Sequence, residues 1–103
     1  MGTRTPLAQE ALTEALRELE GWHLVGGKLH RELVFRSFTE AFAFMTAGAL
    51  IAERMNHHPE WANVYNRLVM DLATHDAQGV TALDVDFARR LQPLIHAFGV
   101  SAP

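Results

Sequence analysis

Hydrophobic positions near the N-terminus repeat every three or four residues, which is the spacing of one face of a helix. The repeat consists of Ala8, Leu12, Leu16 and Leu19. Thr5-Pro6 offers a hydroxyl for the N-cap and a proline suited to the first turn. Gly21 can take the left-handed conformation that ends many helices. The pattern therefore predicts an amphipathic helix over residues 6–20.

The next two hydrophobic segments favour strands and flank Gly26-Gly27. Two glycines between such segments indicate a tight hairpin, because the preferred two-residue turns need positive φ. We predict strands over residues 22–25 and 28–35. One face of the second strand carries Leu29, Leu33 and Phe35. Arg31 interrupts that face, which favours a position near an edge of the sheet.

A long helix that is apolar nearly all round is predicted next. Ser37-Phe-Thr-Glu40 matches a capping box, and the hydrophobic repeat continues to about Asn56, before Pro59. Between residues 41 and 52 only Thr46 is clearly polar. A helix of this kind is buried on more than one side, and one sheet covers one side only. The other side is expected to contact a second subunit or, alternatively, another helix of the same chain.

The second half of the chain predicts two more strands and a last helix. Residues 62–65 are a short strand candidate, and residues 67–74 alternate between an apolar and a mixed face. The apolar face of that second strand carries Leu68, Met70, Leu72 and Thr74. After a loop over 75–79, the segment from Thr81 to Asp84 is a second capping-box pattern that opens a helix. Pro93 predicts a kink or an early end to that helix, and residues 99–103 are expected to fray.

The predicted order of elements is α-β-β-α-β-β-α. Short connections and hairpins favour an antiparallel arrangement, so we predict an α+β fold: a four-stranded antiparallel sheet with three helices packed on one face. The chain has 103 residues, which fits a single domain over residues 1–103.

Composition and charge exclude several classes of function. Nine basic and 12 acidic residues give a net charge of 9 − 12 = −3, which provides no basic surface for nucleic acid. The chain has no cysteine, which excludes disulfides, thiol catalysis and cysteine-bound zinc. No signal pattern is present, and the longest apolar segment, residues 41–52, is shorter than the ~20 residues that a bilayer requires. We expect a cytoplasmic protein that binds neither nucleic acid nor membrane.

Three of the six histidines lie at the ends of predicted elements. His57 and His58 follow the long helix, and His75 follows the last strand. Two imidazoles can act as acid and base near neutral pH, which suits a dehydration and needs no metal or nucleophile. Each residue alone also has a structural interpretation: a helix end favours histidine, and a capping box explains Asp84. Trp61 could simply belong to the core.

A zinc site is the competing functional interpretation, because three histidines and a carboxylate are suitable ligands. Adjacent helical residues point ~100° apart, however, so His57 and His58 would not easily bind one ion. The sequence contains no HExxH motif, no Gly-x-Ser-x-Gly elbow and no glycine-rich nucleotide-binding motif. His23, His30 and His96 have no partner in these patterns and are expected at the surface.

The histidines also belong to a longer pattern of fixed spacing. Glu53 is followed after three residues by His57-His58-Pro59, after five more by Tyr65, after nine by His75 and after eight by Asp84. This pattern resembles the signature of the pterin-4a-carbinolamine dehydratase family. The flanking residues 57–66 and 42–46 are similar to the family as well, whereas Asn56 and Ala73 depart from its common residues.

The resemblance implies an α+β fold of the predicted order and an enzyme that removes water from 4a-hydroxytetrahydropterins. The reaction yields quinonoid dihydropterin and recycles the cofactor of pterin-dependent aromatic amino-acid hydroxylases. His57 and His75 would be the acid/base pair, and His58 would bind or position the pterin. The residues implied to bind or support the substrate site are Pro59, Trp61, Thr74, Asp84 and Glu53.

The resemblance also implies partners. Members of the family use no metal or other cofactor and form dimers or tetramers, which here would use the helix over 38–56 and the sheet edges. A non-catalytic alternative stays open, because the same fold resembles a dimerisation cofactor of a homeodomain transcription factor. A pterin-binding module without turnover is a further alternative.

Overall fold

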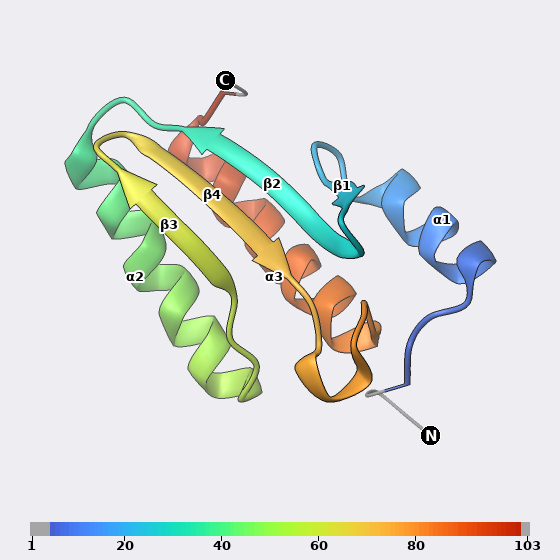
Figure 1. The fold of residues 1–103 in the computed structure, drawn as a ribbon. Coiled ribbons are helices and arrows are strands. Elements are labelled where there is room, and N and C mark those ends of the chain that lie inside the picture. The colour runs from blue at the N-terminus through green and yellow to red at the C-terminus, as the bar shows by residue number, and fades with distance from the viewer. Residues whose placement is uncertain (1–4, 102–103) are drawn as a thin grey trace.

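The computed structural model describes residues 5–101 and has the predicted α+β architecture (Figure 1). Its elements follow the predicted order, with one short 3-10 helix, η1, before the last α-helix. They are α1 (Gln9–Glu18), β1 (His23–Val25), β2 (Lys28–Val34), α2 (Phe38–Met55), β3 (Glu60–Val64), β4 (Arg67–Leu72), η1 (His75–Ala77) and α3 (Ala82–Phe98).

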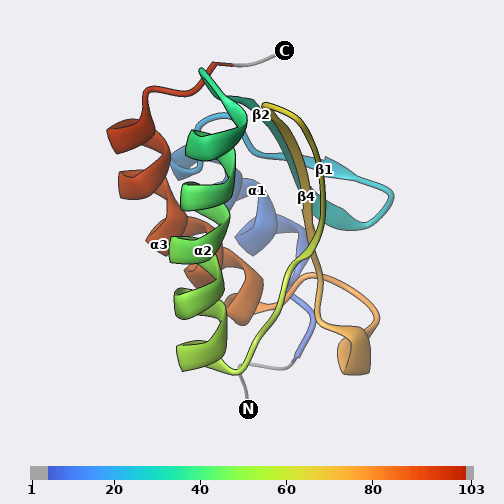
Figure 2. The same cartoon turned by 90° about the vertical axis from the view of Figure 1, so that its left-hand side faces the viewer.

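The four strands form one antiparallel sheet in the order β1-β2-β4-β3. Strand β4 is central: it pairs with β2 through Leu29↔Leu72 and with β3 through Glu60↔Asp71. The helices lie on one side of the sheet and leave the other side open (Figure 2). The predicted four-stranded sheet with helices on one face is therefore confirmed.

Alternation along β4 places the core. Leu68, Met70 and Leu72 are fully buried beneath the helices, and Thr74 continues the same face beyond the end of the strand. The intervening residues, including Asp71, face the open side of the sheet and are half-buried. Phe44 from α2 and Phe87 from α3 complete the core from the helix side. The alternation predicted from the sequence is thus the one that the fold uses.

Two predicted features of the first helix are wrong. Helix α1 begins at Gln9 instead of Pro6, and its N-cap residue, Ala8, makes no side-chain capping bond. The Leu7 amide donates a hydrogen bond of 2.9 Å to the Val80 carbonyl, which holds this segment out of the helix. A long-range contact therefore overrides the local Thr5-Pro6 signal.

Several other boundaries move by a few residues. Strand β3 spans residues 60–64 instead of 62–65, since Tyr65 takes a positive φ of 53° in the turn, and β4 ends at Leu72. Residues 75–77 form η1 within the predicted loop.

Helix α3 continues through Pro93 to Phe98, so the predicted early end is wrong. Pro93 is exposed, where water can satisfy the carbonyl that lacks its helical donor.

The expected fraying of residues 99–103 is also wrong for the part that the structure describes. Ser101 forms an antiparallel bridge with Val34, with hydrogen bonds of 2.9 and 3.0 Å between their backbones. The bridge adds to the edge of β2 beyond the short strand β1, which pairs with β2 only as far as His30. Arg31 is the first residue of β2 after the segment that pairs with β1, so it lies near an edge of the sheet, as predicted. Residues 102 and 103 lie outside the described residues.

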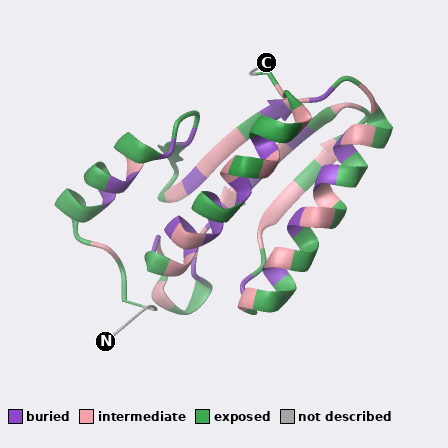
Figure 3. Ribbon diagram, turned by 180° about the vertical axis from the view of Figure 1, so that it is seen from behind, coloured by how far each residue is buried: buried purple, intermediate pink, exposed green. Residues whose placement is uncertain are grey.

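Helix α2 is buried on one side and apolar on both. Its buried residues are Ala41, Phe44, Gly48 and Ala52. Buried positions recur along α2 and α3 (purple in Figure 3). Phe38, Phe42 and Leu50 are exposed on the outer side of α2, and no other element of residues 5–101 covers them. No helix in the described part of the chain is long and apolar enough to span a membrane.

Candidate active site

A pocket of about 290 Å³ opens where the C-terminal end of α2 meets the end of β4 and η1. All three histidines of the sequence pattern line it, together with Pro59 and Thr74. Its lining residues are Asn56, His57, His58, Pro59, Glu60, Ala73, Thr74, His75 and Asp76. The fold therefore brings the histidines from the end of the long helix and from the end of the last strand to one pocket.

The end of α2 determines where the first two histidines point. Asn56 takes the left-handed conformation, with φ 52° and ψ 44°, and ends the helix three residues before Pro59. The His57 amide then donates to the Ala52 carbonyl at 3.0 Å. Asparagine tolerates this conformation better than most residues, which explains why it suits position 56. The reversal directs His57 inward and leaves His58 at the surface.

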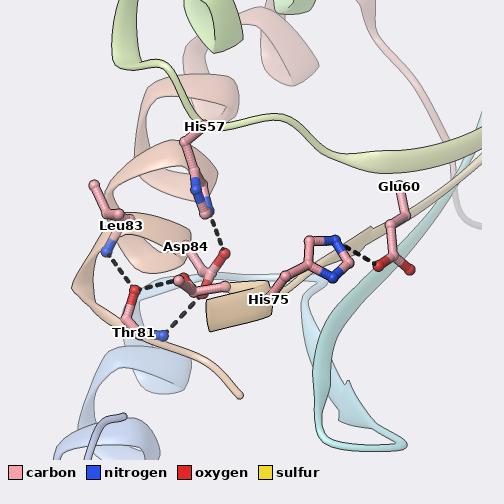
Figure 4. A network of polar contacts seen from close by, with 7 residues as sticks. His57, Glu60, His75, Thr81, Leu83 and Asp84 are labelled. Atoms are coloured by element: carbon pink, nitrogen blue, oxygen red, sulfur yellow. Dashed lines mark hydrogen bonds and ion pairs between the residues drawn. The ribbon is translucent and has the colours of Figure 1, made fainter. Parts of the chain in front are cut away.

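His57 is held by a buried carboxylate. Its Nε2 atom lies 2.5 Å from Oδ1 of Asp84, the side chain of His57 is 7% exposed, and that of Asp84 is 0% exposed (Figure 4). An ionised carboxylate only accepts hydrogen bonds, so the network assigns the proton to Nε2 of His57. Nδ1 is then the ring nitrogen left for a ligand in the pocket.

The second oxygen of Asp84 is also satisfied. Oδ2 accepts hydrogen bonds from the Thr81 amide at 2.8 Å and from the Thr74 hydroxyl at 2.9 Å. The Thr81 hydroxyl in turn accepts from the Leu83 amide at 3.2 Å, which completes the capping box of α3. Asp84 therefore performs the predicted capping and holds His57 at the same time. No buried side-chain polar atom among residues 5–101 lacks a partner.

His58 forms a looser pair at the rim of the pocket. Its Nε2 atom lies 3.0 Å from Oε1 of Glu53, one turn back in α2, and both side chains are exposed. Exposed pairs of this kind add little to stability. Glu53 therefore contacts a site histidine without lining the pocket itself.

His75 lines the pocket from the start of η1 and is 77% exposed. Oε2 of Glu60 lies 3.4 Å from its Nε2 atom, which is ion-pair distance when the imidazole is protonated (Figure 4). The other oxygen of Glu60 accepts a hydrogen bond of 2.6 Å from Nζ of Lys28. This bond to Glu60 is the main cause that raises the pKa of Lys28 above its ordinary value. Glu60 and Lys28 were not singled out in the sequence.

Trp61 does not line the pocket. It pairs with Met70 across the sheet and so faces the helices, where its ring lies 3.4 Å from the position of a Cβ on Gly48. Its contribution to the site is indirect, through the packing of β3 against α2. Tyr65, another residue of the sequence pattern, is exposed in the turn that follows β3.

A histidine and two carboxylates form a cluster on the open side of the sheet. His30, which has no partner in the sequence patterns and was expected at the surface, has Asp71 at 2.8 Å from Nδ1 and Glu32 at 2.9 Å from Nε2. The hydrogen bonds to Glu32 and then to Asp71 raise the pKa of His30. The pairing register of β2 and β4, which aligns His30 with Asp71, was not predictable from the spacing of either strand alone.

The metal interpretation requires several ligands to converge on one point. His57 directs Nε2 at Asp84, and His58 directs Nε2 at Glu53 on the outer side of the helix end. Among residues 5–101, no group of three or more histidine, aspartate or glutamate side chains is arranged to hold a metal ion. The pocket instead presents imidazoles from two walls.

Comparisons with known proteins identify the family of this chain. Residues 5–94 match the family model described as pterin 4 alpha carbinolamine dehydratase. Two relatives carry the name "Putative pterin-4-alpha-carbinolamine dehydratase". The one from Solibacter usitatus is 57% identical over 87% of this chain and 95% of its own length. The one from Mesorhizobium japonicum is 52% identical over 94% of this chain and 98% of its own length.

A solved structure has the same fold. The crystal structure of a transcriptional coactivator/pterin dehydratase from Brucella melitensis superposes with a TM-score of 0.85 at 44% sequence identity. The alignment covers 88% of this chain and 99% of the other. Since the family model spans most of the sequence and the relatives align over nearly their full length, this chain belongs to the pterin 4 alpha carbinolamine dehydratase family.

Proposed function

We propose that this protein is a dehydratase that converts 4a-hydroxytetrahydropterin to quinonoid dihydropterin and water. The observation that carries the proposal is a single pocket that His57 and His58, at the end of α2, line together with His75, at the start of η1. Its volume of about 290 Å³ suits a small bicyclic ligand and lies near the lower end of the range for ligand sites, roughly 300–1,000 Å³.

The reaction needs one proton donor and one proton acceptor. A protonated imidazole donates its proton to the hydroxyl on C4a, and the C–O bond breaks with release of water. The second imidazole removes the proton from the neighbouring ring nitrogen, whose electrons form the new C=N double bond. Atoms and charge balance without any redox partner, so residues that exchange protons near neutral pH are sufficient.

The two catalytic histidines are held differently, and this suits different tasks. Asp84 fixes the ring of His57 through Nε2, so that Nδ1 faces the ligand in a defined orientation. His75 is exposed and can exchange its proton with solvent between turnovers. His58 would contact the pterin at the rim, while Pro59 and Thr74 shape the wall. Glu53 and Trp61 would support this wall from outside the pocket.

The proposed partners are a pterin and further copies of the chain. The exposed apolar side of α2 carries Phe38, Phe42 and Leu50, which a dimer or tetramer through this helix would bury. The sheet edges at β1 and β3 are open to a second copy as well. We expect the enzyme to need no metal or other cofactor. We also expect the chain to form a single domain and to act in the cytoplasm.

A protein-binding module is the second candidate function. The exposed apolar side of α2 favours it, and the Brucella melitensis protein is described as a coactivator as well as a dehydratase. A module that only binds protein has no use for His57 buried against Asp84 beside an open pocket. For this reason the dehydratase is the stronger proposal.

The test is to generate the carbinolamine chemically, add the protein and follow quinonoid dihydropterin by absorbance. We expect a rate well above that of buffer, and treatment with a chelator should leave it unchanged. A rate equal to buffer contradicts the dehydratase. Loss of activity that zinc restores would support the metal site instead.

A further inference from the structure

Three side chains from three different elements meet beside the pocket. Lys28 comes from β2, Glu60 from β3 and His75 from η1. Nζ of Lys28 donates to Oε1 of Glu60 at 2.6 Å, and Oε2 of Glu60 lies 3.4 Å from Nε2 of His75. Each carboxylate oxygen of Glu60 thus serves a different partner, on the side of the sheet that the helices leave open.

The position of Glu60 is well defined. Its strand and the strand of Lys28 both pair with β4, which places the two residues near the same end of the sheet. The short hydrogen bond from Lys28 holds one oxygen of the half-buried carboxylate and leaves the other directed at His75. The raised pKa of Lys28 agrees with a fully charged ammonium at this contact.

His75 by contrast is held by little packing. It lies on a single turn of 3-10 helix and is 77% exposed, so packing does not select one rotamer of its ring. Oε2 of Glu60 is a charged atom within ion-pair distance of the ring. An imidazole that exchanges a proton with a bound substrate must hold its nitrogen within reach of the reacting atom.

We infer that Glu60 is a positioning residue for His75 and that Lys28 acts through Glu60 by holding its carboxylate. The inference rests on the proposed dehydration and adds two residues to it. Exposed ion pairs contribute little to folding stability, so this pair is expected to matter for rate far more than for unfolding.

The kinetic test compares Glu60→Gln, Lys28→Met and Lys28→Arg with the control Glu32→Gln, which removes a carboxylate on the same open side of the sheet without touching His75. Glu60→Gln should lower kcat roughly ten- to a hundredfold, the scale of a misplaced catalytic group. KM should stay within about twofold, since Glu60 acts on the ring of His75 and not on ground-state binding.

The lysine variants test whether Lys28 acts through Glu60. Lys28→Met should lower kcat in the same direction, and Lys28→Arg should retain most of it because arginine also donates to a carboxylate. Adding Lys28→Met to Glu60→Gln should cause no further loss, since Lys28 then has no carboxylate to hold. Glu32→Gln should keep the wild-type kcat. A double variant that loses the product of both single effects contradicts the action of Lys28 through Glu60.

A spectroscopic readout is independent of turnover. The Cε1–Hε1 cross-peak of His75, assigned by its loss in His75→Ala, should move in Glu60→Gln and Lys28→Met at one fixed neutral pH but stay in place in Glu32→Gln. An unchanged kcat in Glu60→Gln, or an unmoved cross-peak, overturns the inference. If the wild-type protein does not accelerate dehydration, the proposed function fails, and the cross-peak still decides whether Glu60 and Lys28 orient His75.

Discussion

Asp84 bonds to His57 with one carboxylate oxygen and caps helix α3 with the other. The distance from Oδ1 to Nε2 of His57 is 2.5 Å, and that from Oδ2 to the Thr81 amide is 2.8 Å. Because both groups are buried, the start of α3 and the orientation of the histidine depend on the same side chain. A change at Asp84 should therefore affect activity and stability together.

Replacing Asp84 with asparagine tests this double role. All three groups around the carboxylate donate to it, so an amide NH₂ at either position forces the facing group to become an acceptor or to lose its partner. We expect kcat to fall at least about tenfold, because His57 loses the acceptor that sets its tautomer. The free energy of unfolding should fall by about 1–3 kcal/mol, the cost of an unpaired buried donor.

The matched control is Asp86→Asn, two residues further along α3, where the carboxylate pairs with Arg90 at the surface. Its effect on unfolding should stay within about 0.5 kcal/mol, and kcat should not change. Equal behaviour of the two variants in denaturant titrations and in rate would refute the role given to Asp84.

Replacing either of the two histidines proposed to be catalytic should affect the stability of the fold differently. His57→Ala removes a buried donor from Asp84, and we expect it to lower the free energy of unfolding by about 1–3 kcal/mol. His75→Ala removes an exposed ring, and its effect should stay within about 0.5 kcal/mol. Both should reduce kcat strongly. Chemical denaturation with a parallel rate assay measures all four quantities, and near-wild-type activity in either variant removes that histidine from the mechanism.

The cluster around His30 predicts a pH dependence of stability. Glu32 and Asp71 raise the pKa of His30 in the folded protein above its ordinary value of 6.5. A raised pKa means that the folded state holds the proton more tightly than the unfolded state. The resulting stabilisation is complete below pH 6.5, while the carboxylates stay ionised, and is lost as the pH rises through the folded value.

Unfolding titrations of the wild-type protein and His30→Gln across this pH range measure the effect. The difference in unfolding free energy should be largest on the acidic side and shrink towards alkaline pH. Glu32→Gln should flatten the dependence, because it removes the largest cause of the shift. A difference that grows with rising pH would contradict the assignment.

The exposed side of α2 predicts self-association. Phe42 is 54% exposed there beside Phe38. Sedimentation velocity should show a dimer or tetramer for the wild-type protein, and Phe42→Glu should shift it towards the monomer because a charge is costly in an apolar interface. Ala97→Glu, on the exposed side of α3, is the control and should associate as the wild type does. A monomeric wild-type protein would contradict the proposed use of this surface.

Local sequence signals predicted much of the fold because they act over a few residues. The Gly26-Gly27 turn has positive φ at both glycines, and Ser37 and Thr81 cap the helices they were predicted to begin. The apolar alternation from Leu68 to Thr74 fixed the buried face of β4. The spacing from Glu53 to Asp84 singled out all three histidines that line the pocket.

Contacts between distant segments explain what the sequence did not predict. Leu7 is held by Val80, which moves the start of α1, and Ser101 is held by Val34. The pairs of Glu60 with Lys28 and of His30 with Asp71 depend on strand order and register. Neither residue spacing nor composition contains that information, because any of several registers would have kept the apolar faces buried.

The formation of quinonoid dihydropterin from chemically generated carbinolamine is the most direct measurement of the central claim. The wild-type protein should accelerate the appearance of the product well above buffer, and the double variant His57→Ala/His75→Ala should return the rate to that of buffer. A wild-type rate equal to buffer, or a double variant as fast as the wild type, would contradict dehydration by these two histidines.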